Sequence, residues 1–366
     1  MTSQADSQIA TQPDGRPFHD RSPSEQMTAT PTPADQRSAT RVVFPEPRRV
    51  ELEDMIVDLR DLGPHEVVVQ ARRSVISPGT ELAHYRGDSL VGLLPPAQPF
   101  HPGYAMAGTV LAAGPDSGFV AGTSVLSHTP HQSVVRFDPR QRVCLQLPDG
   151  IEPDIAPFAR LGQIGGISLQ LTTARPGDTV AVIGLGPVGN LAAQLAQVSG
   201  YRVISDERSP GRRALARTTG LSTVVAPEEA GDAVAPAGAN LVLECSGSQH
   251  AVLLATEICA HHGEVMMIGA PWRHEPEVAA SSVTARVFER FLSLRSGWEW
   301  QVPLYDGERS VAGCTRWVLE RLADGSVVTG RLVSRTITPD QAHAAYGMLD
   351  SEPERHLTFL FDWEAT

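Results

Sequence analysis

The stretch Thr179-Val-Ala-Val-Ile-Gly-Leu-Gly-Pro-Val-Gly-Asn190 joins a largely apolar run of five residues to a GxGxxG motif. The run predicts a buried strand, and the helical spacing of apolar residues after the motif predicts a helix that the third glycine opens. Gly184 permits the tight turn, Gly186 has no Cβ to obstruct a pyrophosphate, and Gly189 lets helix and strand pack closely. The helix N-terminus attracts phosphate. We therefore expect a dinucleotide-binding turn, which also includes Pro187 and Val188.

Two acidic residues follow the next apolar segment, and they bear on the choice of dinucleotide. Asp206 and Glu207 end this segment, and Glu207 lies 21 residues after Gly186, where a carboxylate would accept hydrogen bonds from the ribose hydroxyls of NAD. Arg208, Arg212 and Arg213 come next and could pair with the 2′-phosphate of NADP, or be a solvated helix start. We expect NAD, with NADP as the alternative, and count Asp206, Glu207 and Arg212 among the cofactor-binding residues.

Length and composition exclude several classes of protein. The 366 residues suffice for about two domains plus extra material. The 30 basic and 42 acidic residues give a net charge of −12, which argues against a nucleic-acid surface or a polybasic membrane anchor. All 30 basic residues are arginine, so Schiff-base chemistry on a lysine is excluded.

The cysteines and the N-terminus indicate a cytoplasmic protein. Cys144, Cys245, Cys259 and Cys314 are scattered and form no CxxC pair, so neither a disulfide framework nor a zinc knuckle is expected. The chain has no secretory leader pattern and no run near the ~20 apolar residues of a membrane span.

The pattern along the chain divides it into four parts. Residues 1–40 are rich in Ser, Thr, Pro and Gln and predict a disordered extension. Residues 41–160 carry short β-type runs between Gly and Pro turns and predict a β-rich domain. Residues 161–302 alternate strands and helices, which predicts an α/β domain with a doubly wound parallel sheet. Residues 303–366 are expected to rejoin the β-rich domain.

Six strands are expected in the α/β domain, at residues 180–183, 202–205, 223–225, 241–245, 264–268 and 292–295. Ligands of such sheets bind at the carboxyl ends of the strands. Cys245, Ser246 and Gly269 follow two of these strands and are expected to line the nicotinamide site.

The chain resembles the medium-chain dehydrogenase/reductase superfamily over residues 41–366. The resemblance rests on Ser77-Pro-Gly-Thr-Glu-Leu-Ala-His-Tyr-Arg-Gly87, Pro102-Gly-Tyr-Ala-Met-Ala-Gly-Thr-Val110, Arg175-Pro-Gly-Asp178 before the glycine turn, and Leu243-Glu-Cys-Ser-Gly247. It implies a GroES-like catalytic domain, split in sequence around a Rossmann domain, with the active site in the cleft between them. It also implies a homodimer, formed through the edge strand at residues 292–295.

The sequence departs from the zinc-binding members of this superfamily at each ligand position. Pro78 stands where those members have Cys, Tyr104 and Ala105 replace His and Glu, and a gap-free count puts Arg160 at the third ligand position. None of these side chains is a zinc donor at neutral pH. We expect no catalytic metal.

Without a metal, another group must stabilise the charge that develops on oxygen during hydride transfer. Arg160 is the leading candidate, with a structural ion pair at the domain junction as the alternative. The resemblance implies that Thr80 relays a proton, although it could instead cap a helix. Tyr104 is a further candidate for the residue that donates a proton. Trp298 and Trp300 are expected to shape the cleft or a dimer seam, or to be core residues.

We expect a zinc-independent NAD(P)-dependent oxidoreductase that moves hydride between nicotinamide and a carbonyl or secondary alcohol. The polar residues Arg160, Thr80 and Tyr104 favour a small sugar-like or cyclitol-like substrate. Two alternatives remain: a zinc-free enoyl or quinone reductase of the same fold, and a nucleotide-binding protein without turnover.

Overall fold

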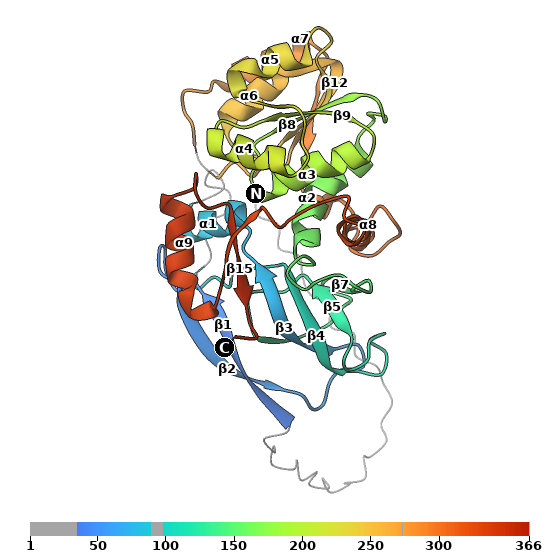
Figure 1. Cartoon of the computed structure of the whole chain (residues 1–366), viewed down its shortest axis with the longest axis vertical. Coiled ribbons are helices and arrows are strands. Elements are labelled where there is room, and N and C mark those ends of the chain that lie inside the picture. Colours follow the sequence, from blue (N-terminus) through green and yellow to red (C-terminus); the bar gives the residue numbers. More distant parts are fainter. Residues whose placement is uncertain (1–34, 89–97, 273, 366) are drawn as a thin grey trace, which may run out of the picture.

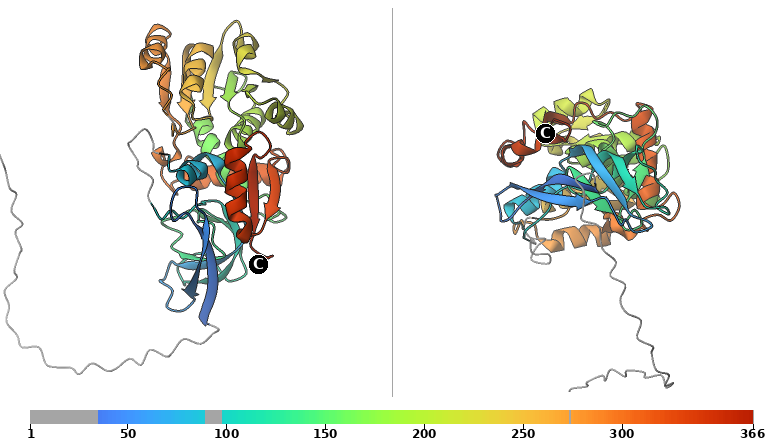
Figure 2. Two further views of the ribbon diagram at one scale, coloured as in Figure 1. Left: turned by 90° about the vertical axis from the view of Figure 1, so that its left-hand side faces the viewer. Right: turned by 90° about the horizontal axis from the view of Figure 1, so that it is seen from below.

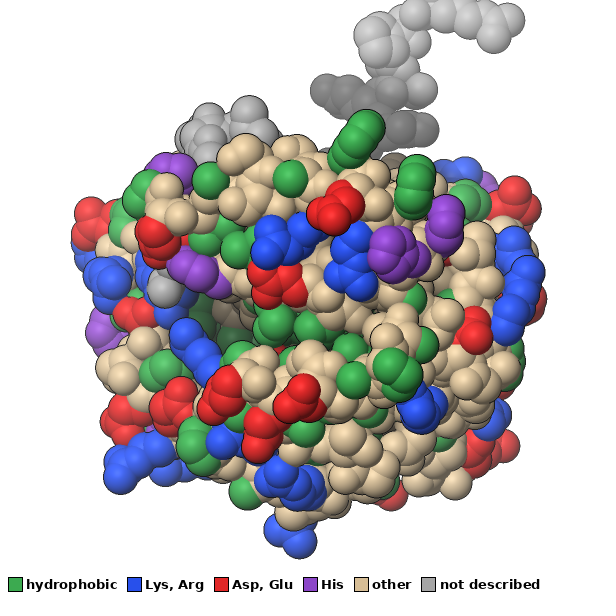
Figure 3. All heavy atoms as spheres, turned by 90° about the horizontal axis from the view of Figure 1, so that it is seen from above, with side chains coloured by type: hydrophobic (Ala, Val, Ile, Leu, Met, Phe, Trp, Pro, Cys, Tyr) green, Lys and Arg blue, Asp and Glu red, His purple; other side chains and the backbone are tan. Residues whose placement is uncertain are grey.

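The computed structural model describes residues 35–88, 98–272 and 274–365. Figure 1 shows two bodies stacked along the long axis, a helix-covered sheet above and a β-rich body below. Among the described residues no helix is long and apolar enough to cross a membrane. Seen from above, acidic and basic side chains are interspersed over the surface (Figure 3).

The upper body contains a parallel sheet in the order β10-β9-β8-β11-β12-β13. Its strands are β8 (Thr179–Ile183), β9 (Arg202–Asp206), β10 (Val224–Val225), β11 (Ala239–Glu244), β12 (Cys259–Met267) and β13 (Ser293–Ser296). Its helices are α3 (Pro187–Val198), α4 (Pro210–Thr218), α5 (Ala230–Val234), α6 (Gln249–Ile258) and α7 (Ala280–Glu289). All six predicted strands and the parallel order are confirmed.

Alternate residues of β8 face two different cores. Val180 and Val182 pack with α3, whereas Ala181 and Ile183 pack with α5 and α6. Burial on both faces explains why this strand reads as an unbroken apolar run. The helix α3 begins at Pro187 and not at Gly189, because a proline suits the first position of a helix and Gly186 supplies the N-cap.

The lower body is built around a seven-stranded sheet in the order β14-β15-β3-β4-β5-β7, with β6 paired to β3, and a separate β1-β2 ribbon. Its strands are β1 (Gln36–Val43), β2 (Glu51–Asp58), β3 (Val67–Val75), β4 (Met106–Ala113), β5 (Ser124–Ser127), β6 (Val134–Phe137), β7 (Cys144–Gln146), β14 (Val333–Ile337) and β15 (Thr358–Asp362). β15 pairs antiparallel with β3, so residues 358–362 are part of this body.

The predicted disordered extension ends too late. Residues 36–40 belong to β1, where they pair with β2 and Ala39 is buried at 2% exposure. The remainder of the predicted extension, residues 1–34, lies outside the described residues.

The described residues also form the helices α1 (Pro78–Arg86), α2 (Phe158–Leu171), α8 (Val311–Ala323) and α9 (Ala342–Ser351). The predicted change of pattern at residue 161 falls inside α2, which packs on both α3 and α8. α9 packs on α1 and lies against the lower body in both side views (Figures 1 and 2). Three 3₁₀ turns, Pro227–Glu229, Glu299–Gln301 and Pro339–Gln341, also occur.

Candidate active site

The glycine turn at the carboxyl end of β8 has the space that a dinucleotide needs. Gly184 has a φ of +86°, which favours glycine. A Cβ on Gly189 would lie 1.9 Å from the Gly184 carbonyl oxygen, whereas a Cβ on Gly186 would meet nothing within 4 Å. The first turn of α3 has no side-chain cap, so its N–H groups are available to an anion. These residues fit a pyrophosphate.

Glu207 lies directly against this turn. Its carboxylate is 4% exposed, and its two oxygens accept hydrogen bonds from the N–H groups of Leu185 at 2.8 Å and Ser209 at 2.9 Å. Each oxygen keeps a lone pair that a ribose hydroxyl can use. Glu207 thus also ties the glycine turn to the start of α4, a structural role that the sequence did not predict.

Asp206, the neighbour of Glu207, is an unusual carboxyl group. Its side chain is 3% exposed, and Oδ2 has no hydrogen-bond partner among the described residues. Burial, together with the charge of Glu207, raises the pKa of Asp206 to about 7.

The expected nicotinamide-site residues come together at the same sheet edge. A Cβ on Gly184 would lie 2.9 Å from Cβ of Ser246, and a Cβ on Gly189 would lie 3.1 Å from Cβ of Cys245. A Cβ on Gly269 would lie 2.1 Å from the backbone nitrogen of Gly247. The buried Glu244 carboxylate orders this edge by accepting the Ser246 N–H at 2.7 Å and the Gly247 N–H at 3.1 Å.

Arg160, which is buried, and Tyr104, which is half-buried, form a polar group between the two bodies. Arg160 is 4% exposed, and its guanidinium carbon lies 4.7 Å from the centroid of the Tyr104 ring. Its Nη2 donates to Glu299 at 2.6 Å and its Nη1 donates to Gln163 at 2.7 Å. The Tyr104 hydroxyl donates to Oγ of Ser77. Burial raises the pKa of Tyr104, so its phenol keeps its proton at neutral pH.

Comparison with known proteins gives the family to which this arrangement belongs. A family of zinc-binding dehydrogenases matches residues 187–298. 2-Desacetyl-2-hydroxyethyl bacteriochlorophyllide A dehydrogenase of Cereibacter sphaeroides is 27% identical over 89% of this chain and 99% of its own length. L-idonate 5-dehydrogenase of Escherichia coli aligns with a TM-score of 0.75 at 16% identity, over 89% of this chain and 99% of that chain. An Escherichia coli short chain alcohol dehydrogenase complexed with NADH aligns with a TM-score of 0.70 at 16% identity, over the same shares of 89% and 99%.

The chain belongs to the medium-chain dehydrogenase/reductase superfamily. It is an NAD(P)-dependent oxidoreductase of the alcohol dehydrogenase type, with a GroES-like body and a Rossmann body. Membership therefore favours an enzyme over the nucleotide-binding protein without turnover.

Thr80, the third residue that we expect to be catalytic, is not hydrogen-bonded to Arg160 or Tyr104. It is half-buried in the first turn of α1. The N-cap of this helix is Ser77, and no side chain caps it, so Thr80 has no capping role either.

The start of α1 is instead held by a buried network that the sequence did not reveal. Glu81, 1% exposed, accepts the Ser77 N–H at 2.7 Å, the Tyr346 hydroxyl at 2.5 Å and a hydrogen bond with Nε2 of His131 at 3.1 Å. Nδ1 of His131 contacts Oγ of Ser74 at 2.8 Å. Because Ser77 also accepts from Tyr104, this network positions the candidate site.

The arginines after Glu207 are turned toward backbone carbonyls. Arg212 donates to the Pro353 carbonyl oxygen at 2.6 Å, from Nη2, and Arg213 donates to the Glu207 carbonyl oxygen at 2.7 Å. Arg208 is exposed. The side chain of Arg212 is therefore bound to the segment that follows α9.

Two tryptophans flank the buried Glu299, and neither is a core residue. Trp298 is 56% exposed and Trp300 is 57% exposed, whereas Glu299 between them is 5% exposed. The core alternative for these tryptophans is wrong, because the ion pair to Arg160 draws only Glu299 inward.

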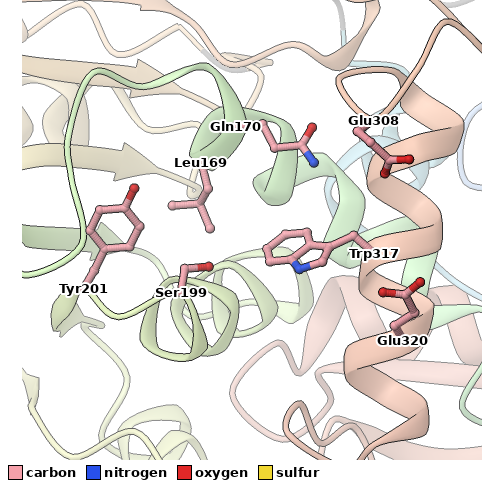
Figure 4. Close-up of a pocket in the computed structure, with 7 residues that line it drawn as sticks. All are labelled: Leu169, Gln170, Ser199, Tyr201, Glu308, Trp317 and Glu320. Atoms are coloured by element: carbon pink, nitrogen blue, oxygen red, sulfur yellow. The ribbon is translucent and has the colours of Figure 1, made fainter.

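Among the described residues, no group of three or more His, Cys, Asp or Glu side chains is placed to hold a metal. A surface cavity of about 240 Å³, below the ~300–1,000 Å³ usual for ligand pockets, lies away from the glycine turn. Tyr201 and Trp317 lie on two sides of it (Figure 4). Tyr201 precedes β9 at its amino end, opposite the edge that carries Glu207, so this cavity is not the cofactor site.

Proposed function

We propose that this enzyme is zinc-independent and moves hydride between nicotinamide and a carbonyl or secondary alcohol carbon of a small polar, sugar-like or cyclitol-like substrate. The observation that carries the proposal is the buried guanidinium of Arg160, stacked on Tyr104, where the zinc-binding members have a metal ligand. In this proposal the guanidinium, paired with the Glu299 carboxylate, takes the place of the metal ion.

The chemistry requires positive charge and a proton near the reacting oxygen. NAD(P), when bound, supplies or accepts the hydride. Nε of Arg160 has no partner among the described residues, so its N–H is available to an oxygen that gains negative charge. The protonated Tyr104 hydroxyl lies beside it and can exchange a proton through Ser77. We assign a stabilising role to Arg160 and proton transfer to Tyr104, and a relay of that proton by Thr80 stays a prediction from the family resemblance alone.

We further propose that NAD is the preferred cofactor, with Glu207 and Asp206 at the ribose. The contacts of Glu207 under the glycine turn support this choice, as do Arg212 and Arg213, whose side chains already donate to carbonyl oxygens. Arg208 is exposed and is the residue that NADP binding would use.

We also propose a cytoplasmic homodimer. β13 is the edge strand of the parallel sheet, and Phe288 and Phe291 beside it are 86% and 65% exposed. An edge strand flanked by exposed aromatic residues is suited to pairing with a second copy.

Two further observations bear on the substrate. The relative from Cereibacter sphaeroides is named as a dehydrogenase of a hydroxyethyl compound, which is an alcohol and supports the alcohol dehydrogenase type of reaction. The protonated Tyr104 also suits an enoyl or quinone reductase, in which a tyrosine protonates the carbon next to the site of hydride addition.

A substrate panel tests the proposal. Purified enzyme should oxidise NADH in the presence of ketones and hydroxyketones, or reduce NAD with polyols, as followed by absorbance of the reduced cofactor. Turnover of enones alone would favour the enoyl reductase. Cofactor binding without turnover of any compound would contradict the proposed function.

A further inference from the structure

His128 lies on the same rim as Tyr104. In the antiparallel pair of β4 and β5, Ser127 at the end of β5 is opposite Met106 at the start of β4, so His128 and Tyr104 lie at the same end of the two strands. The backbone N–H of His128 donates to the Val143 carbonyl oxygen at 2.9 Å, which fixes the chain at this point. His128 therefore lies at the end of the sheet that carries Tyr104, over whose ring the Arg160 guanidinium stacks.

The imidazole of His128 is buried without partners. Its side chain is 7% exposed, and neither ring nitrogen has a hydrogen-bond partner among the described residues. Nε of Arg160, which stacks on Tyr104, and Nε2 of the fully buried Gln163, which accepts a hydrogen bond from Arg160, also have none. An unpaired buried polar group costs ~1–3 kcal/mol, so three such groups around one position indicate a binding function and not a folding role.

The protonation state of His128 defines what the group can bind. Burial and the nearby charge of Arg160 lower the pKa of His128 well below its usual value, so the ring is neutral at neutral pH. A neutral imidazole offers one donor and one acceptor, and the Gln163 amide offers donors. A hydroxyl group, which both donates and accepts, satisfies this set, whereas an alkyl group leaves every member unpaired.

We propose that His128, together with Gln163, binds a hydroxyl group adjacent to the reacting carbon and thereby selects hydroxyketones and polyols over plain ketones and alcohols. This inference rests on the proposed function and names the feature of the substrate that the site recognises. Arg160 faces the reacting oxygen, and His128 faces the neighbouring hydroxyl. A site built to bind a hydroxyl group rejects an analogue without it more strongly than an apolar pocket discriminates by size.

Matched ketones test the assignment. The hydroxyketone that the wild type reduces best is compared with the ketone lacking that hydroxyl, acetoin and butanone being the smallest such pair. We expect the ratio of the two kcat/KM values to favour the hydroxyketone in the wild type and to fall at least tenfold in His128→Leu. A ratio that stays within twofold of the wild-type value overturns the assignment.

Thermal stability separates binding from a structural role. His128→Leu removes two unpaired buried nitrogens from a site of similar volume, so its melting temperature should equal or exceed that of the wild type. His131→Leu is the matched control, because both nitrogens of His131 have partners, and its melting temperature should fall. A fall of several degrees in His128→Leu would show that the ring is structural. Failure of the wild type to reduce any ketone would instead refute the proposed function, irrespective of this melting behaviour.

Discussion

Arg160 and Glu299 form a buried ion pair of 2.6 Å between α2 and the segment after β13. Arg160→Ala should lower kcat by roughly a hundred- to a thousandfold, because losing one preorganised donor to a developing oxyanion costs ~2.7–4 kcal/mol. The variant should also melt at a lower temperature, since it leaves the Glu299 carboxylate buried and unpaired. Steady-state kinetics and thermal melts measure the two effects.

A double variant distinguishes catalysis from stability at this pair. Arg160→Met combined with Glu299→Gln removes both charges, so the melting temperature should recover while kcat stays low. Recovery of turnover in the double variant would mean that Arg160 is only a structural partner of Glu299. A rise in KM alone would make it a substrate anchor.

Metal removal should leave the activity intact. Pro78, Tyr104 and Arg160 occupy the ligand positions of zinc-binding relatives and offer no zinc donor. Elemental analysis of purified enzyme should find no stoichiometric zinc, and prolonged treatment with a strong chelator should not reduce turnover. One zinc per chain, lost together with activity, would refute the zinc-independent mechanism.

Cofactor preference should depend on the charge of Glu207. Glu207→Gln keeps the size of the side chain and removes the charge that repels a 2′-phosphate, so the preference for NAD over NADP should fall about tenfold, or ~1.4 kcal/mol. Glu207→Ser should weaken the preference as well, and should also reduce stability because the Leu185 and Ser209 N–H groups lose their acceptor. A wild type that binds NADP tenfold more tightly than NAD would contradict the assignment and point to Arg208.

Two N-terminal truncations should differ sharply. Removing residues 1–34 should leave the melting temperature unchanged, because their composition offers few apolar side chains to pack on the body. Removing residues 1–40 deletes most of β1, including the buried Ala39, and should lower it by several degrees. Equal melting temperatures for both truncations would mean that β1 contributes nothing to stability.

Burial of Asp206 should make the enzyme less stable as the pH rises. The pKa of this group is about 7 in the folded protein against an ordinary value of 3.8, so between these values the folded state holds a proton that the unfolded state has lost. The free energy of unfolding should therefore decrease from pH 4 to pH 7, by on the order of 1–4 kcal/mol from this group. Asp206→Asn should flatten this dependence in urea titrations at each pH. A residual slope of the same sign is expected from Glu244, whose burial also raises its pKa to about 7.

Periodic features of the fold could be predicted from the sequence. Strands buried on both faces, such as β8, give continuous apolar runs, and the glycine turn has a local signature. β2 was missed because most of its residues are exposed in a two-stranded ribbon, so it carries little apolar pattern. The sequence signal for α1 is weak, because its apolar residues show no helical periodicity and its start, Pro78-Gly79, resembles a turn.

The partners within the candidate site could not be predicted, because they are distant in the sequence. Glu299 lies 139 residues after Arg160, and Tyr346 lies 265 residues after Glu81. The local sequence pattern predicts which face of a helix or strand is buried. It does not predict which side chain of another element contacts that face. The same limit applies to His128, whose lack of a partner is visible only once the surrounding elements are in place.

The pairing of β15 with β3 also sets an order of events during synthesis. Every strand of the parallel sheet lies between residues 179 and 296, so that body can fold while the ribosome is still translating the rest. The lower sheet cannot close in this way, because Leu360 in β15 pairs with Val75 in β3. Until residues 358–362 emerge, residues 73–75 of β3 present an unpaired edge that a chaperone or another nascent chain can bind. The nucleotide half is thus complete well before the half that completes the catalytic site.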